Sequence, residues 1–174
     1  MAWKMNDLSG GPGFIGNVLS HMGEERGMAY LRQLARQDIR VLNASARAVL
    51  DQVIAGEYAV ALQIFNHHAV ISAKKGAPVD WIKMEPATGT LSVLSIHKNA
   101  PHPNAAKLLV DFIISKEGQE VFRDADYIPA HPGVAALVPT LKPKEGNFRV
   151  HFFTPEETEE GMPEWKKVSD ELFR

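Results

Sequence analysis

The chain has 174 residues, of which 45% are hydrophobic and 23% are charged, as expected for a globular protein with one good core. Its formal net charge of -2 excludes the basic surface that nucleic-acid binding needs. The absence of cysteine excludes disulfides and thiolate metal sites, and no apolar run is long enough to span a membrane.

Apolar residues recur at helical spacing along much of the chain, and short apolar runs separate these segments. In chain order the pattern predicts a helix over 14–22, a helix over 24–36, a strand over 39–42, a helix around 49–54, a strand over 57–64 and a short helix ending near 74–76. It then predicts strands over 79–84 and 90–96, helices over 104–114 and 115–122, an extended loop over 127–144 and a last helix after the N-cap Thr154. Helices that alternate with short strands favour an α/β layered sheet.

Three stretches carry a resemblance to a known family. They are Asp51–Ala61 (DQVIAGEYAVA), the run from Lys98 to Gln119 with the signature APHPNAAKLLVDFIISKEGQ, and Ala2–Lys4 (AWK). Together they resemble the iron-type and related members of the type II periplasmic binding proteins of ABC importers. The second stretch is the most specific of the three.

The resemblance implies an α/β lobe in which a mixed sheet carries helices on both faces. It implies that residues 1–88 form the second, C-terminal lobe and that residues 89–130 are an incomplete segment returning to the first lobe. Residues 131–174 are then a loop and C-terminal helices that pack back on the second lobe. Because the match begins in the middle of the family pattern, we expect a truncated chain whose signal peptide and first lobe lie upstream. The run Met1–Asp7 itself has no apolar leader region.

The function that the resemblance implies is solute capture in the periplasm or outside the cell. Two lobes would close by hinge motion on a metal ion, a metal chelate or a small anionic solute, and the closed form would dock on the membrane permease of an ABC importer. A bound metal ion is the only cofactor this suggests. Such a protein is not an enzyme.

His67 and His68 are the first candidate ligands, because neutral imidazole binds transition metals and the pair follows a predicted buried strand. In the ferric-binding branch two adjacent tyrosines follow an asparagine at the equivalent place. Here Asn66 is kept and histidines replace both tyrosines, which argues against ferric iron. The alternative is that one histidine packs on the following helix and the other meets solvent.

Two further turns precede helices and offer free backbone N–H groups to an anion. One contains Asn43 and Ser45, and the other contains Ser9 and Gly11. The alternatives are an ordinary N-cap at the first turn and a simple turn into a helix at the second.

Two other functions remain open at this stage. The first is a metal-dependent enzyme centred on His67 and His68, although the chain lacks the G-x-S-x-G and H-E-x-x-H motifs. The second is a cytosolic interaction module.

The resemblance also predicts an exposed surface. Residues 90–96 and 104–122 would pack on first-lobe strands that the chain does not contain, so their apolar faces should be exposed and should favour a homodimer.

Overall fold

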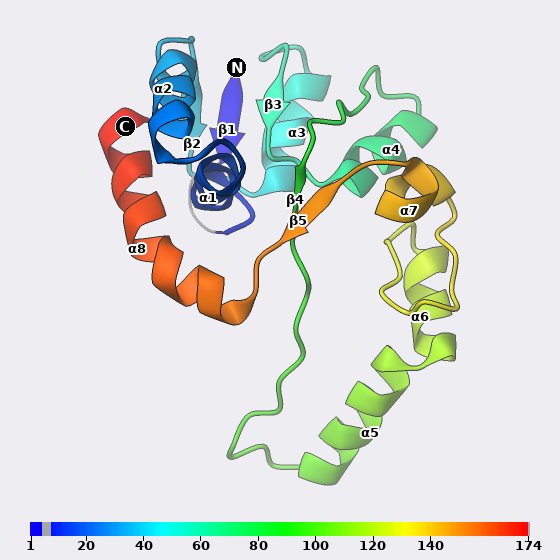
Figure 1. Ribbon diagram of the computed structural model, residues 1–174. Helices are drawn as coiled ribbons and strands as arrows, with labels where there is room; N and C mark the ends of the chain where they lie inside the picture. Colours follow the sequence, from blue (N-terminus) through cyan, green and yellow to red (C-terminus); the bar gives the residue numbers. More distant parts are fainter. Residues whose placement is uncertain (5–7, 174) are drawn as a thin grey trace. The chain divides into compact units, whose positions relative to one another are not determined.

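The computed structural model describes residues 1–4 and 8–173 (Figure 1). Residues 5–7, which are part of the run Met1–Asp7 discussed above, lie outside the described residues. Arg174 lies outside them as well. The chain divides into two compact units, Met1–Thr90 with Arg149–Arg174, and Leu91–Phe148. None of the described helices has the length and apolar character needed to cross a membrane.

The first unit contains most of the regular structure. Its elements are β1 (Ala2–Lys4), α1 (Gly11–Met22), α2 (Glu24–Ala35), β2 (Arg40–Leu42), α3 (Ala46–Ile54), β3 (Ala61–Leu62), α4 (Asn66–Lys74), β4 (Ala87–Gly89), β5 (Val150–Phe152) and α8 (Pro155–Leu172). The second unit contains α5 (Pro103–Ile114), α6 (Lys116–Asp124), the 3-10 helix η1 (Pro139–Leu141) and α7 (Pro143–Gly146).

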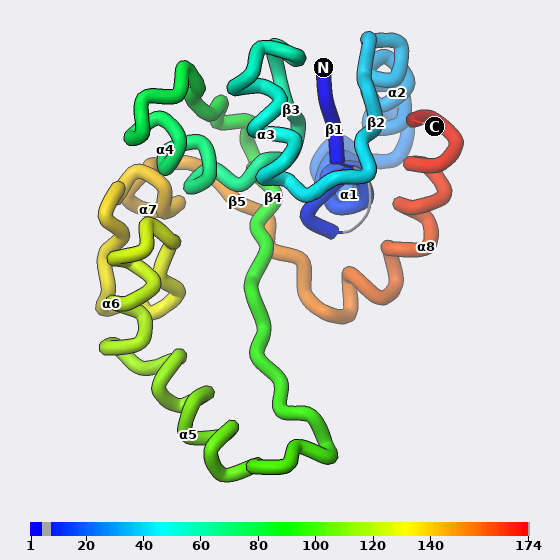
Figure 2. Tube along the Cα trace, turned by 180° about the vertical axis from the view of Figure 1, so that it is seen from behind, coloured from blue at the N-terminus to red at the C-terminus, as the bar shows by residue number. Residues whose placement is uncertain are grey.

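Three strands of the first unit form a sheet in the order β2-β1-β3, with Trp3 opposite Val41 and Leu62 (Figures 1 and 2). Strands β4 and β5 form a separate pair in which Thr88 lies opposite His151. The predicted α/β class is therefore confirmed. Every strand pair among the described residues is parallel, where the resemblance implied a mixed sheet.

The helices begin and end close to the predicted positions because local signals set them. Gly23 follows α1 with a φ of 76°, and Gly56 follows α3 with a φ of 82°. A side chain is strained in this left-handed region, whereas glycine reaches it freely and ends the helix. The helical periodicity and the glycine positions are both visible in the sequence, so these predictions are confirmed.

Several strand predictions are wrong. The run 57–64 forms only the two-residue strand β3, and no strand is described over 79–84 or 90–96. Strand β4 lies between the latter two segments, and β5 was not predicted. A strand exists only where a neighbouring backbone completes its hydrogen bonds, and β4 finds its partner more than 60 residues away. The predicted loop over 127–144 also contains η1 and the start of α7.

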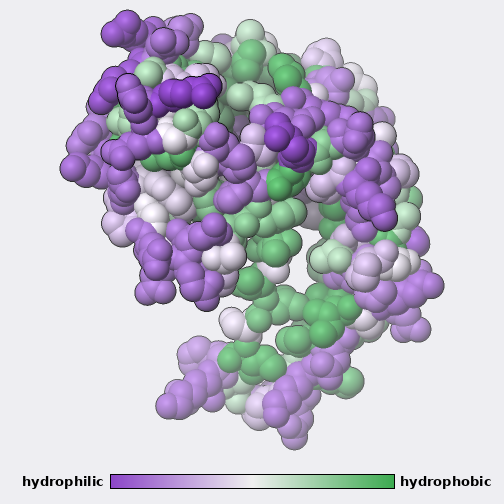
Figure 3. Space-filling view, in the orientation of Figure 1, coloured by the Kyte–Doolittle hydropathy of each residue, from purple (hydrophilic) through white to green (hydrophobic). Residues whose placement is uncertain are grey.

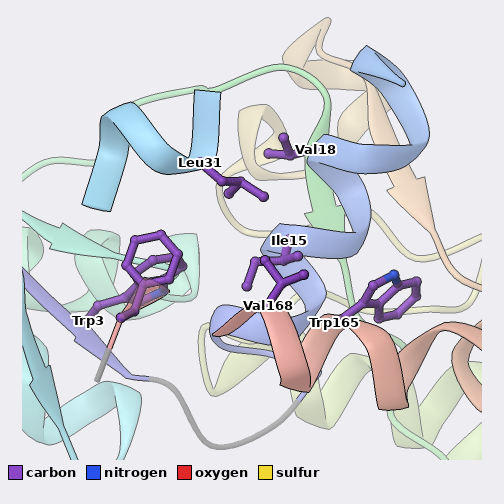
Figure 4. Close-up of a cluster of buried hydrophobic side chains, with 7 residues drawn as sticks. Trp3, Ile15, Val18, Leu31, Trp165 and Val168 are labelled. Carbon is purple, nitrogen blue, oxygen red and sulfur yellow. The ribbon is translucent and has the colours of Figure 1, made fainter. Parts of the chain in front are cut away.

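The core of the first unit lies between β1 and the helices α1, α2 and α8 (Figure 4). Trp3, Ile15 and Leu31 are fully buried. The ring of Trp165 from α8 lies against Gly16 of α1, where a Cβ atom would come within 2.6 Å of the ring. The long C-terminal helix is therefore held against α1 by a close backbone approach that only glycine permits.

The start of α8 carries a complete capping box. The hydroxyl of Thr154 accepts a hydrogen bond from the Glu157 backbone at 3.2 Å, and the Glu157 carboxylate accepts one from the Thr154 backbone at 2.8 Å. Replacing Thr154 with alanine should lower the free energy of unfolding by about 1 kcal/mol, because a backbone N–H of the first turn loses its acceptor. Urea denaturation measures this change. The control Thr154→Ser keeps the hydroxyl and should be nearly neutral, and equal losses in both variants would contradict the capping role.

The second unit has little core of its own. The Gln119 side chain links its parts, donating to the Ile113 carbonyl at 2.9 Å and accepting from the Ala130 backbone at 2.7 Å. Helix α5 has no buried residue. The predicted exposure of apolar side chains over 90–96 and 104–122 is confirmed.

Candidate functional site

The three parallel strands of the first unit end at one edge of their sheet, and the loops that follow them carry all the predicted ligand-binding residues. Ser9 and Gly11 follow β1, Asn43 and Ser45 follow β2, and Asn66–His68 follow β3. The carboxyl edge of a parallel sheet is the usual place for a ligand in an α/β fold. This edge is therefore the candidate site.

The loop after β1 is tied to its own strand. The Lys4 ammonium group donates a hydrogen bond of 3.0 Å to the Ser9 hydroxyl. Gly11, the first residue of α1, is buried. Lys4, the last residue of β1, therefore lies at the same edge as Ser9, and it was not selected from the sequence.

The loop after β2 shows an ordinary helix cap. The Ser45 hydroxyl accepts a hydrogen bond of 3.2 Å from the Ala48 backbone, so the capping alternative is confirmed for this residue. Asn43 is exposed two residues earlier. A role for either residue in ligand binding stays a prediction.

Arg47 in the first turn of α3 is a candidate residue that was not selected from the sequence. Its guanidinium group donates to the Asp51 carboxylate at 2.6 Å and to the Ser72 hydroxyl of α4 at 2.8 Å. The Asp51 bond spans one helical turn, a spacing visible in the sequence. The Ser72 bond joins two helices and required the tertiary structure.

The loop after β3 places both histidines at the start of α4. The Asn66 side chain accepts a hydrogen bond of 2.8 Å from the His67 backbone. The two imidazole rings lie with their centroids 4.4 Å apart, and the Phe65 ring stacks on His67 at 5.6 Å. The pair is thus packed together beside an aromatic ring.

Both histidines are neutral at physiological pH. Burial, followed by the nearby His68 ring, lowers the pKa of His67 to about 4. Burial and then the positive charge of Arg47 lower the pKa of His68, and Asp51 raises it. This effect of Arg47 and Asp51 places His68, Arg47 and Asp51 in one electrostatic cluster across α3 and α4.

The depressed pKa of His67 predicts a loss of stability in acid. Between about pH 6.5 and about pH 4 the unfolded chain binds a proton at His67 that the folded chain does not, so the free energy of unfolding falls as the pH falls through this window. His67→Gln should reduce the slope by at most about 1.4 kcal/mol per pH unit. Urea titrations between these pH values measure it, with the exposed His102→Gln as control. An unchanged slope in His67→Gln would contradict the burial of this ring.

The side chains at this edge suit an anion better than a metal ion. The described residues contain no group of three or more histidine and carboxylate side chains that could hold a metal. His67 and His68 alone would leave half of the positions of a tetrahedral ion unfilled. Arg47 also repels a cation near His68.

A second polar cluster was not predicted, and it consists of Gln63, Asn17 and Thr88. Gln63, the residue after β3, has a left-handed φ of 57°, and its amide reaches the Thr88 hydroxyl at 3.5 Å. The buried Asn17 of α1 donates to Thr88 at 3.1 Å and to the Pro86 carbonyl at 2.7 Å. These contacts tie the end of β3 to β4 and α1. Among the described residues at this edge, Gln63 is the one residue other than glycine with a positive φ.

Comparison with known proteins yields one family. The sequence model described as bacterial extracellular solute-binding protein matches residues 28–120, just over half of the chain. No curated protein and no solved structure matches. The matched region contains β2, β3 and the loops with Asn43, Arg47 and the histidine pair. The chain therefore belongs to the bacterial extracellular solute-binding proteins, the family that captures solutes for ABC importers.

Proposed function

We propose that this chain binds a small anionic solute at the carboxyl edge of the β2-β1-β3 sheet. The observation that carries the proposal is the placement of Arg47, which Asp51 and Ser72 hold at the start of α3, in the same electrostatic cluster as His68. A guanidinium group held in this way offers a planar set of donors to a carboxylate or phosphate.

The starts of two helices support the same ligand chemistry. Helices α3 and α4 both begin at this edge, and their first turns direct backbone N–H groups and the positive ends of their dipoles toward it. The Nδ1 atom of His68 is buried and has no hydrogen-bond partner among the described residues. A buried polar atom of this kind calls for a partner, which a bound solute would supply.

The family supports a place for this site in a larger cycle. In the proposal, the first unit is the second lobe of a two-lobed binding protein and the second unit belongs to the other lobe. The lobes close on the solute in the periplasm or outside the cell. The closed form then docks on the membrane permease of an ABC importer. The chain acts by binding and not by catalysis.

A metal ion or chelate at His67 and His68, as the iron-type resemblance implies, is the second candidate. The neutral state of both imidazoles favours it, because a protonated imidazole cannot bind a metal. The charge of Arg47 opposes a bare cation and tolerates a chelate whose own ligands are anionic.

Thermal unfolding of the chain with defined solutes tests the proposal. The panel contains phosphate, sulfate, citrate and a sugar phosphate on one side, and Zn²⁺, Ni²⁺ and Fe³⁺ on the other. An anion present at about 100 times its dissociation constant should stabilise the protein by about 2.7 kcal/mol, and the metals alone should not. His68→Ala should weaken the effect, whereas the exposed His102→Ala should leave it unchanged.

Two results would decide against the anion. A shift with a metal alone, lost in both His67→Ala and His68→Ala, would establish the second candidate. No shift with any anion or metal, in folded protein freed of carried-over solute, would overturn binding at this edge. Turnover that depends on an added metal would instead establish the enzyme alternative.

A further inference from the structure

The two covalent connections between the compact units both pass through the β4–β5 strand pair. The second unit is Leu91–Phe148, and β4 ends at Gly89 just before it, whereas β5 begins at Val150 just after it. The backbone N–H of Ala87 donates to the Arg149 carbonyl at 2.9 Å, so the two connections are joined where they leave the first unit. A change in this strand pair therefore acts on both connections at once.

The chain beyond β4 is not fixed by backbone hydrogen bonds. The segment Leu91–Ile96 has no charged residue, and Figure 3 shows hydrophobic residues along it. None of its residues takes part in a backbone hydrogen bond with another described residue. Strand β4 is therefore the last part of this connection that backbone pairing holds in the first unit.

Side chains join the β4–β5 pair to the sheet that carries the proposed binding edge. Among the described residues, no strand hydrogen bond links the pair to the β2-β1-β3 sheet. Two amide side chains meet instead at the Thr88 hydroxyl, which accepts from Gln63 at 3.5 Å and from Asn17 at 3.1 Å. A hydroxyl oxygen has two lone pairs, so Thr88 is able to accept both bonds. The Gln63 bond is long and therefore weak, and a shift at the binding edge is able to shorten it.

Asn17 is the fixed end of this contact. It is 5% exposed on α1, and its amide also donates to the Pro86 carbonyl at 2.7 Å. One turn further along α1, the His21 ring meets the His151 ring of β5 edge-on, with the centroids 4.9 Å apart. Helix α1 therefore contacts both strands of the pair and gives them a rigid support.

Gln63 is the end of the contact that lies at the binding edge. It directly follows β3 and begins the loop that carries His67 and His68. Its φ of 57° is left-handed, and a residue other than glycine is strained there unless the surrounding contacts hold it. An extended backbone is open to glutamine without this strain. Gln63 therefore has two alternative states, and contacts at either end of it are able to shift the balance between them.

We propose that Gln63 and Thr88 transmit solute binding from this edge to the β4–β5 pair. The inference rests on the proposed function, since the solute is the anion bound beside Arg47 and His68. A solute at the start of α4 orders the loop that begins at Gln63 and favours its left-handed state, in which the amide lies against Thr88. The tightened bond holds β4 against α1. Binding thus stabilises the pair through which both connections run, which is where a movement between the lobes acts.

Coupling of this kind is reciprocal. If the solute stabilises the contact between Gln63 and Thr88, the contact raises the affinity for the solute by the same factor. A neutral hydrogen bond changes an equilibrium by about 2- to 10-fold. Thr88, which lies on a different sheet from the binding edge, should therefore influence solute affinity without touching the solute.

Hydrogen exchange of the full chain, followed by mass spectrometry, tests the transmission. The probe is phosphate, sulfate or citrate, whichever stabilises the chain in the thermal screen. Bound anion should slow exchange of peptides over 86–90 and 149–153 by about 2- to 10-fold. In Thr88→Val, which keeps the shape of the side chain and removes the acceptor, this slowing should disappear, whereas the slowing over 64–70 at the site itself should remain. The matched control is Thr90→Val at an exposed threonine two residues further on, which should behave as the unmodified chain.

Calorimetric titration with the same anion provides the reciprocal readout. Thr88→Val and Gln63→Met should each weaken binding by about 2- to 10-fold, and Thr90→Val should not. The double variant should lose no more than the larger single loss, because both changes remove the same contact. Gln63→Met keeps the contact between Asn17 and Thr88, so it provides a second test should Thr88→Val fold poorly. Circular dichroism of each variant shows whether its helix content is retained.

The possible results separate this inference from the proposed function. If an anion binds and exchange over 86–90 and 149–153 is unchanged, the transmission is overturned and the proposed function stands. Slowing that survives in both Thr88→Val and Gln63→Met also overturns the transmission, as do equal affinity losses in Thr88→Val and Thr90→Val. If no anion binds, the proposed function fails, and the transmission fails with it.

Discussion

Replacing Trp3 with alanine is expected to lower the free energy of unfolding by about 3–5 kcal/mol, the cost of removing a large aromatic side chain from a packed core. Trp3 is fully buried on the central strand of the sheet. Its ring meets Phe14 of α1 edge-on at 5.4 Å and Phe173, just after α8, at 4.9 Å. The substitution therefore empties the place where the first strand and the last helix of the first unit meet.

Two comparison variants separate packing from other effects. The Trp3 indole N–H is buried without a hydrogen-bond partner among the described residues, so Trp3→Phe removes no such bond and should cost less than Trp3→Ala. Trp81 is only partly buried and lies outside this core, so Trp81→Ala should cost less than Trp3→Ala. Urea denaturation with equal m-values measures all three. A Trp3→Ala variant no less stable than Trp81→Ala would contradict the proposed core.

Replacing Arg47 with methionine is expected to weaken binding of the anionic solute by about 10- to 100-fold. This is the effect of losing a hydrogen bond between charged groups, which contributes about 1.5–3 kcal/mol. Methionine keeps the length of the side chain and removes the donors. The affinity of Arg47→Lys should fall between those of the unmodified chain and Arg47→Met, because an ammonium group keeps the charge without the planar pair of donors. Calorimetric titration with the anion found in the thermal screen measures each constant.

Asp51 provides the opposite test at the same place. Its carboxylate competes with an anion for the Arg47 guanidinium, which it contacts at 2.6 Å. Asp51→Asn should therefore strengthen anion binding, and it should weaken binding of a cation. The exposed Arg32 of α2 is the matched control, and Arg32→Met should leave the constant unchanged. Equal losses in Arg32→Met and Arg47→Met would point to a general charge effect and contradict a site at Arg47.

Much of the candidate site could be predicted from the sequence, because turn residues before a helical pattern mark the loops that carry it. The turns with Asn43 and Asn66 each follow a predicted strand and precede a predicted helix, and the turn with Ser9 precedes a predicted helix, which is the arrangement found. Arg47 could have been selected as well, since an arginine at the start of a helix with an aspartate four residues later is a local signal. Its contact with Ser72 could not, because 25 residues separate the two side chains.

Gln63 and Asn17 illustrate a different limit. Nothing in a glutamine after an apolar run indicates a left-handed backbone, and nothing in an asparagine on α1 indicates that it binds the carbonyl of Pro86. The contacts of both side chains with Pro86 and Thr88 depend on where β4 lies. The position of β4 depends in turn on β5, its partner from the far end of the chain.

The sequence alone determined the α/β class and the helix positions. These follow from periodicity, glycine positions and hydrophobic composition, which act within one or two turns of the chain. The tertiary structure alone decided which apolar runs became strands, which residues joined Arg47 and His68 across α3 and α4, and the parallel direction of the strand pairs. Strand hydrogen bonds and contacts between helices join residues distant in the chain, so their energy exists only once the fold has brought those residues together.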